Sequence, residues 1–142
     1  MRLRSLGGTV RNPTGLPGDA IRVLGVAVLC AAGFVAVWGI RTMGKHLVAP
    51  AEVRPDTELV TTGPFGLVRH PMYLSVLMLW AGGMLALLSW ALAVGLALLV
   101  PAFCLRARAE EELLTRHFGA AYSAYIARVP MMLPGLPPRS RR

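Results

Sequence analysis

The chain has 142 residues, of which 55% are hydrophobic and only 15% are charged. With a mean hydropathy of +0.56, it has too few polar residues to cover a water-facing surface, which argues against an ordinary soluble domain. The formal net charge is +8, but the Lys and Arg residues lie outside the apolar runs, as they do in membrane proteins. Composition therefore favours an integral membrane protein and argues against nucleic acid as a partner.

The first element expected is a transmembrane helix over residues 23–40, which follows an N-terminal basic segment, residues 1–22. This apolar run is bounded by Arg22 and Arg41. Its length is close to the roughly 20 residues that cross a bilayer core of about 30 Å. The run is longer than the apolar part of a usual signal peptide, so we expect a retained helix.

The next element expected is a transmembrane hairpin over residues 72–105. Its two apolar runs, 72–88 and 90–105, carry no charge. At about 1.5 Å per residue a single helix would overshoot the bilayer, so we expect two antiparallel helices with a turn near residues 88–90. Small residues allow helices to approach closely in membranes, and we expect Ala81, Gly82 and Gly83 to serve the hairpin in this way.

Polar segments flank the hairpin on both sides. Residues 41–71 are rich in Pro and Gly and predict a cytosolic loop. Residues 106–134 begin with charged helix formers and predict a cytosolic amphipathic helix followed by a Pro-rich stretch, and residues 135–142 predict a disordered basic tail. The expected fold class is all-α and integral to the membrane, with about three transmembrane helices.

The distribution of basic residues predicts the topology. If the first run crosses and the next two form a hairpin, the 41–71 loop and the C-terminal tail share one side of the membrane. That side holds 11 of the Lys and Arg residues, against four before the first helix. The positive-inside rule then places the loop and the C-terminus in the cytoplasm, and the protein in the cell membrane as a multi-pass protein.

Two clusters of polar residues lie at the cytosolic ends of the hairpin. Arg69 and His70 precede its first helix, and Glu110 and Glu111 follow its second. Antiparallel helices bring the start of one next to the end of the other, so we expect these two pairs to meet. Basic groups at a helix N-terminus suit a carboxylate or phosphate, and carboxylates suit an ammonium or a ribose diol. S-adenosylmethionine is one ligand that carries these groups.

These residues also carry a family resemblance. The run GPFGLVRHPMYL at residues 63–74, followed by EExxL at residues 110–114 and then by FG and YxxY, resembles the isoprenylcysteine carboxyl methyltransferase family. That family belongs to a wider group that includes phospholipid and small-thiol methylating enzymes. The resemblance covers about residues 61–134. It implies S-adenosylmethionine as cofactor at the cytosolic face and a lipophilic acceptor that enters from the bilayer.

Site residues follow by position in the motifs. The resemblance implies cofactor binding by Gly63, Phe65, Arg69, His70, Pro71, Tyr73, Glu110 and Glu111. The candidate catalytic residues are Arg69, Arg108 and Glu111, and no metal ligands are expected. Arg108 would hold a carboxylate acceptor, whereas Glu111 or His70 would take the proton of an amine or thiol.

Two positions depart from the family pattern. Phe65 stands where the family often has Tyr, and Ser75 stands where it has Gly. From the resemblance we expect the first change to remove a hydroxyl contact and the second to tighten the approach of the backbone to the cofactor.

Other interpretations remain open at the level of sequence. The Arg-His pair could anchor a helix start at the interface, and Tyr122 and Tyr125 could simply pack an amphipathic helix. Glu112 is expected to be solvated and to pair with Arg116 four residues later. The alternative function is a small membrane scaffold with a basic tail that binds anionic lipids, and a homodimer is left open.

Overall fold

The computed structural model describes residues 18–44 and 58–134. Within these ranges the protein is all-α and has no strand, which confirms the expected fold class. Residues 1–17 of the predicted basic segment, residues 45–57 of the predicted loop and the predicted basic tail at 135–142 lie outside the described residues.

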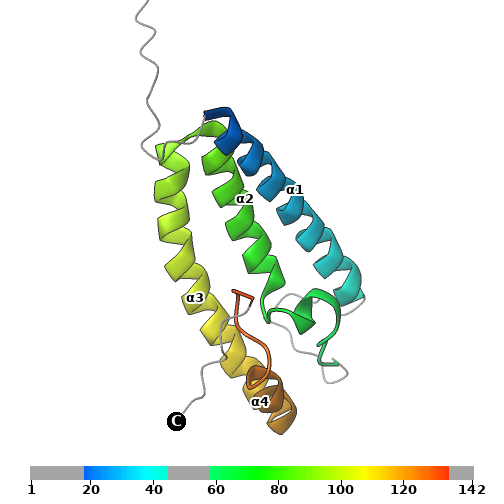
Figure 1. Ribbon diagram of the computed structural model, residues 1–142. Coiled ribbons are helices and arrows are strands. Elements are labelled where there is room, and N and C mark those ends of the chain that lie inside the picture. Colours follow the sequence, from blue (N-terminus) through cyan, green and yellow to red (C-terminus); the bar gives the residue numbers. More distant parts are fainter. Residues whose placement is uncertain (1–17, 45–57, 135–142) are drawn as a thin grey trace, which may run out of the picture.

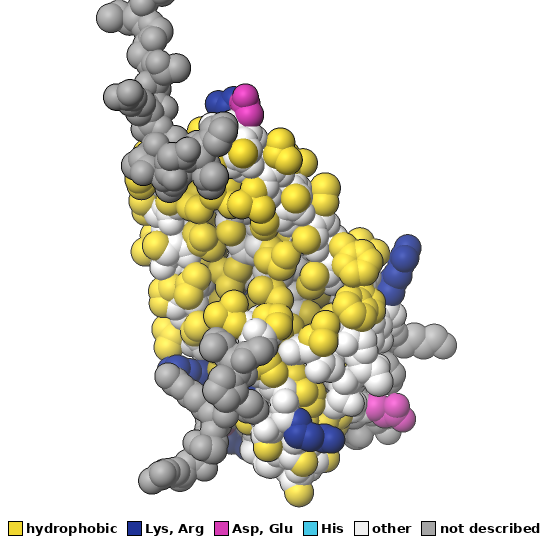
Figure 2. Space-filling model, in the orientation of Figure 1, with side chains coloured by type: hydrophobic (Ala, Val, Ile, Leu, Met, Phe, Trp, Pro, Cys, Tyr) yellow, Lys and Arg dark blue, Asp and Glu magenta, His cyan; other side chains and the backbone are white. Residues whose placement is uncertain are grey.

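Three long helices lie side by side (Figure 1). They are α1 (Gly18–Met43), α2 (Pro71–Leu87) and α3 (Trp90–Phe118), and α2 lies between the other two. By length and composition, α1 and α3 could each cross a membrane, and α2 is a shorter apolar helix. Figure 2 shows a broad hydrophobic surface over the helices, with charged side chains near the ends. A lipid environment suits such a surface.

Glycines bring α1 and α2 into backbone contact. A Cβ added to Gly25 would lie 2.8 Å from the Gly82 carbonyl oxygen and would also overlap the backbone of Ala86. A Cβ added to Gly82 would lie 2.9 Å from the Gly25 carbonyl oxygen. The expectation that Gly82 serves the hairpin is therefore wrong, because this residue packs against α1. Small residues at such a contact allow the close packing that holds membrane helices together.

The contact between α2 and α3 depends on a different glycine. The Trp80 ring of α2 fills the space that a Cβ on Gly95 of α3 would occupy. Of the two remaining small residues predicted for this contact, Gly83 does face α3, since its Cβ position lies 3.3 Å from the Leu92 side chain. The hairpin is thus packed by an aromatic ring in a glycine notch as well as by small residues.

The hairpin turns at residues 88 and 89, as predicted. Leu88 adopts the left-handed conformation that ends many helices, with φ of 51°, and Ser89 is the N-cap residue that precedes α3. The helix expected after residue 105 is continuous with the second helix of the hairpin, so α3 runs without a break to Phe118. Arg, Ala, Glu and Leu in this stretch are all good helix formers, so nothing in the sequence ends the helix there.

The chain folds back after α3. Gly119, with φ of 55°, separates α3 from the short helix α4 (Ala120–Ile126). Residues 127–134, here called the return segment, then run from α4 back toward the start of α2 (Figure 1). A short 3-10 helix, η2 (Gly63–Gly66), lies ahead of α2 and packs against α1. This end of the bundle holds the polar residues.

The glycine contact between α1 and α2 predicts the effect of adding one methyl group. Gly25→Ala should lower the unfolding temperature in detergent, because the backbones must separate, at a cost of about 1–3 kcal/mol. Gly33→Ala in the same helix is the matched control, since a Cβ there meets nothing within 4 Å. Equal unfolding temperatures for the two variants would contradict the close approach.

Candidate active site

The candidate site lies at the start of α2 and beside the polar C-terminal part of α3. Arg69 and His70 immediately precede α2, and Pro71 occupies its first position, where its fixed φ suits a helix start. The Arg69 Nε donates a hydrogen bond to Glu111 Oε1 at 2.8 Å, and the His70 Nε2 lies 3.2 Å from the same oxygen. The prediction that the Arg-His pair and the glutamate pair meet is confirmed.

Two of the three guanidinium nitrogens of Arg69 are bonded within the protein. Its side chain is only 6% exposed. Besides Glu111, its guanidinium donates to the carbonyl oxygens of Ile126 at 3.0 Å and Val129 at 2.8 Å. The Ile126 carbonyl ends α4, where a positive charge is favourable, and the Val129 carbonyl lies in the return segment. Arg69 therefore joins α3, α4 and the start of α2.

The His70 ring lies between the two carboxylates. Its Nδ1 is 3.7 Å from Glu110 Oε2, and its Nε2 faces Glu111. The side chain is 8% exposed, so both neighbouring charges act on it with little screening by water. The two carboxylates therefore hold the His70 ring in a defined orientation.

Glu110 belongs to a second, more accessible group. The Tyr73 hydroxyl donates to Glu110 Oε1. The Arg106 Nε donates to the Tyr73 hydroxyl at 2.8 Å and to Glu110 Oε1 at 3.2 Å. The Arg106 side chain is 62% exposed and that of Glu110 is 18% exposed, so a ligand can reach this group from solvent.

Aromatic rings connect the site to the membrane-facing part of the hairpin. The Tyr73 ring stacks on His70 at 5.5 Å and on Phe103 at 4.9 Å between ring centres. Phe103 lies on α3, two residues before the end of its apolar run. The row of rings therefore leads from the polar site toward the apolar part of α3.

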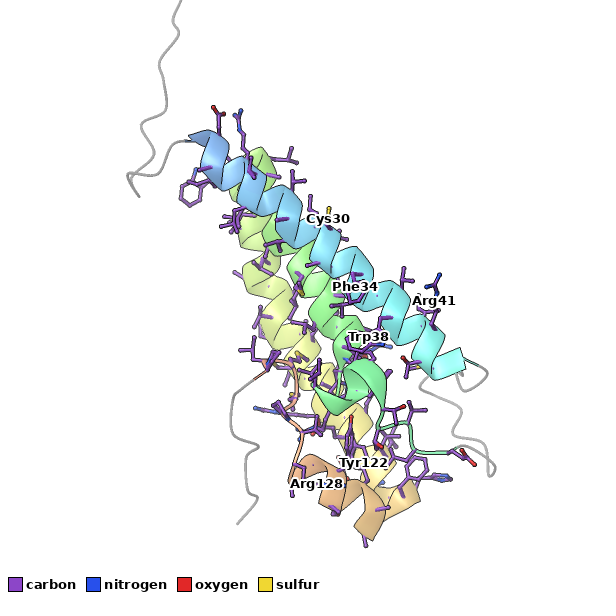
Figure 3. All side chains as sticks on the ribbon, turned by 45° about the vertical axis from the view of Figure 1, so that its right-hand side comes forward. Cys30, Phe34, Trp38, Arg41, Tyr122 and Arg128 are labelled. Carbon is purple, nitrogen blue, oxygen red and sulfur yellow. The ribbon has the colours of Figure 1, made fainter. Side chains whose placement is uncertain are left out.

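Residues 63–66 contribute to the site indirectly. Gly63 has φ of 59° and packs against Trp38 and Thr42 of α1, and Figure 3 shows Trp38 beside η2. Phe65 is buried, and its carbonyl oxygen accepts a hydrogen bond from the Tyr125 hydroxyl at 2.6 Å. The structure does not bring Gly63 or Phe65 into contact with the glutamate pair, so they remain only predicted cofactor ligands.

Helix α4 supplies two buried tyrosines. Tyr122 is 1% exposed and Tyr125 is 4% exposed, and they pack with Val129. Figure 3 shows Tyr122 between α4 and the body of the protein. Of the two interpretations left open, the structure supports packing, with the Tyr125 hydroxyl also fixing the loop before α2.

One predicted site residue lies apart from the others. Arg108 is exposed, and no hydrogen bond or ion pair of the described residues joins it to the cluster. Its neighbour Arg106, which the sequence prediction missed, occupies the position beside Glu110 instead. The spacing of four residues between Arg106 and Glu110 is the signal that could have identified this pair.

The remaining predictions near the site can also be compared with the structure. Glu112 pairs with Arg116 at 2.6 Å, and both side chains are mostly exposed, as expected. Pro71 is fully buried, and Ser75 is 5% exposed, with its hydroxyl bonded to the Met72 carbonyl oxygen at 2.7 Å. Ser75 thus satisfies its own hydroxyl within α2.

Charge in the buried part of the site is set by these contacts. Burial alone would raise the pKa of Glu111, but the hydrogen bond from His70 and the charge of Arg69 more than offset it, so the pKa is lowered. Burial raises the pKa of Tyr125 to about 12 and raises that of Tyr122 as well. Glu111 is therefore ionised at neutral pH, whereas both tyrosines keep their protons.

The residues present fit S-adenosylmethionine, the cofactor that the sequence motif implies. The accessible Arg106 guanidinium can donate to a carboxylate, and the Glu110 carboxylate can accept from an ammonium or a hydroxyl. Arg69 and Glu111 are buried and paired with each other, so they support the site from behind. The described residues include no group of three or more His, Cys, Asp or Glu arranged to hold a metal ion.

Comparison with known proteins gives the same class. The sequence matches the phospholipid methyltransferase family over residues 20–121, a range that includes α1, η2, α2 and α3 almost completely. Fold and motifs together define a membrane protein of the isoprenylcysteine carboxyl methyltransferase-like group. Within that group, the chain belongs to the phospholipid methyltransferase family.

One relative can be named. The chain is 39% identical over 87 residues to the nickel-cobalt-cadmium resistance protein NccN of Alcaligenes xylosoxydans xylosoxydans. This similarity covers 58% of the chain and 39% of the length of NccN. The chain therefore spans well under half of that relative.

Burial of the ion pair predicts unequal roles for adjacent glutamates. Glu111→Ala should lower the free energy of unfolding by about 3–5 kcal/mol, because it leaves the buried Arg69 charge without its partner. Glu112→Ala, the matched control, removes an exposed pair and should cost about 1 kcal/mol or less. Chemical unfolding in detergent would measure both, and similar costs would contradict the burial of Glu111.

The lowered pKa of Glu111 predicts a loss of stability in acid. Its ion pair contributes fully above the ordinary carboxyl pKa, and this contribution is lost as the pH falls through the lower pKa of the folded state. The unfolding temperature of the wild-type protein should therefore fall more steeply over this acidic range than that of Glu111→Gln. Parallel pH profiles would show that Glu111 does not titrate in this way.

Proposed function

We propose that the protein transfers a methyl group from S-adenosylmethionine to a lipophilic acceptor at the membrane surface. The observation that carries the proposal is the meeting of Arg69 and His70 with Glu110 and Glu111 at one end of the bundle. These residues belong to the two motifs that define the resemblance. Membership of a methyltransferase family supports the same conclusion.

The burial of the charges supports an enzyme over a scaffold. A basic residue that only anchors a helix start keeps its charge in water, whereas the Arg69 and Glu111 side chains are 6% and 7% exposed. Burying charged groups costs free energy that the pair must recover through good geometry. Such an arrangement is typical of a functional site in which orientation matters.

Each group of residues has a separate role in this proposal. Arg106, Tyr73 and Glu110 hold the amino acid part of the cofactor through the accessible guanidinium, hydroxyl and carboxylate. When bound, S-adenosylmethionine supplies a methyl group that is already activated by the adjacent sulfonium. The protein therefore has to position the acceptor and exclude water.

Proton transfer is the task we assign to His70. Glu111 is bonded to Arg69 and has a lowered pKa, so it is a poor proton acceptor at neutral pH. The His70 ring beside it can accept a proton from an amine or a thiol, and the Glu111 carboxylate stabilises the resulting charge. A carboxylate acceptor would need no base.

The acceptor we propose is drawn from the bilayer. The first candidate is the carboxylate of an isoprenylcysteine-like compound, and a phospholipid amine or a small thiol are the alternatives. The row of rings from His70 to Phe103 leads from the polar site to the apolar part of the hairpin, which suits a molecule with a polar end and an apolar chain. Anionic lipids would meet the basic residues around the site.

The orientation we propose places this end of the bundle in the cytoplasm. The end of α1, the start of α2 and the end of α3 lie at the same end of the bundle (Figure 1). Of the seven Arg residues in the described ranges, all but Arg22 lie toward this end, and the more basic side of a membrane protein usually faces the cytoplasm. A homodimer remains a proposal as well.

Cofactor binding can be tested directly. Calorimetric titration of the detergent-solubilised protein with S-adenosylhomocysteine should give saturable binding, and Glu110→Gln should weaken it by about tenfold or more through the loss of a charged hydrogen bond. Glu112→Gln is the matched control and should bind normally. No binding to well-folded wild-type protein would rule the proposal out.

The acceptor requires a separate measurement. Membranes that contain the protein would be incubated with S-adenosylmethionine labelled in its methyl group, and their lipid extract would be separated. Base-labile label would indicate an ester and hence a carboxylate acceptor, whereas stable label in phospholipid would indicate an amine.

A further inference from the structure

Arg69, at the start of α2, binds the return segment, residues 127–134. We infer that Arg69 is a positioning residue that holds this segment in place as a wall of the site, and that it does not bind the ligand itself. The catalytic part of this inference rests on the proposed function. It departs from the expectation that Arg69 is a cofactor ligand.

The Arg69 guanidinium is hydrogen-bonded within the protein. Nε is bonded to Glu111, and NH1 is bonded to the carbonyl oxygens of both Ile126 and Val129. The side chain is 6% exposed. Nε and NH1 therefore face protein partners, and a ligand carboxylate would have to displace several charged hydrogen bonds to reach them.

Main-chain hydrogen bonds also attach the return segment to residues 69–70. The Arg69 amide donates to the Pro130 carbonyl oxygen at 2.9 Å, and the His70 amide donates to that of Met131 at 3.0 Å. The return segment thus binds both the side chain and the main chain at residues 69–70. Because His70 takes part, a shift of the segment would also move the ring that lies between the two glutamates.

The stability of α4 also depends on these contacts. A helix of seven residues has little stability of its own. Arg69 binds the carbonyl oxygen of its last residue, Ile126. In addition, the Tyr125 hydroxyl of α4 donates a hydrogen bond to the carbonyl oxygen of Phe65 in η2. Two separate bonds therefore dock α4 and the return segment against the residues that precede α2.

Burial indicates what the docked segment does. Val129 and Met132 are 9% and 7% exposed, and they lie in the same stretch as the carbonyls that bind Arg69 and His70. The segment therefore covers residues 69–70 and keeps water from the buried ion pair. Its loss would misplace His70 and admit water while leaving the accessible Arg106 and Glu110 intact.

The experiment compares two ways of loosening the same segment. Arg69→Lys keeps the positive charge but loses the branched set of hydrogen bonds, and Tyr125→Phe removes only the bond to Phe65. Arg116→Lys is the control, because Arg116 is exposed and bonded only to Glu112. For each protein, amide hydrogen exchange at residues 69–70, the affinity for S-adenosylhomocysteine and the turnover number would be measured.

We expect Arg69→Lys and Tyr125→Phe to speed amide exchange at residues 69–70 in the absence of any ligand. Both should lower the turnover number by about tenfold to a hundredfold through misplacement of the reacting groups, with the cofactor affinity nearly unchanged. Because the two variants loosen one segment, the double variant should lose less than the product of the single effects. A variant that only destabilised the fold would not change turnover well below its unfolding temperature.

Two results would overturn the inference. In the first, Arg69→Lys weakens S-adenosylhomocysteine binding while Tyr125→Phe changes nothing, which would make Arg69 a ligand-binding residue. In the second, amide exchange at residues 69–70 is the same in all variants, which would show that the segment is not held by these bonds. Should Arg69→Lys fail to fold, Tyr125→Phe alone decides by the same exchange and turnover criteria.

Failure of the proposed function would look different. A wild-type protein without S-adenosylhomocysteine binding or methyl transfer would overturn the enzyme assignment and the catalytic part of the inference together. The exchange measurement needs no cofactor, so it would still decide whether Arg69 holds the return segment.

Discussion

The carboxylate of Glu111 is the point at which separate parts of the chain are joined. It receives Arg69 and His70, which precede α2, while Arg69 also binds the end of α4. In a buried setting, the penalty for separating such charges exceeds the free energy that the intact pair contributes. The polar end of the bundle is therefore held in one arrangement, and the orientation of His70 depends on it.

The helices supply the frame that this network requires. Backbone contact at Gly25 and Gly82 fixes α1 against α2, and Trp80 in the notch at Gly95 fixes α2 against α3. At about 1.5 Å per residue, the 29 residues of α3 span roughly 44 Å, well beyond a bilayer core of about 30 Å. The excess length carries Glu110 and Glu111 out of the apolar region to the level of His70.

The sequence predicted the helices and the meeting of the two motifs because apolar runs and hairpin geometry depend on local patterns. It predicted helix after residue 105, but not that this helix is continuous with the hairpin helix and ends at Phe118, ahead of Gly119. Nor could it assign Gly82 to α1, because a glycine does not reveal which neighbour approaches it. The partners of Arg69 in residues 126–129 are backbone carbonyls, which leave no signature in side-chain patterns.

The modest length of α2 has a consequence for the depth at which chemistry would occur. Its 17 residues span roughly 26 Å, somewhat less than the thickness of the hydrocarbon layer. A helix that is shorter than the hydrocarbon layer draws the bilayer thinner around it. His70, at its N-terminus, would then lie level with the glycerol and head-group zone of one leaflet, where a lipid can present its polar end without withdrawing its chains.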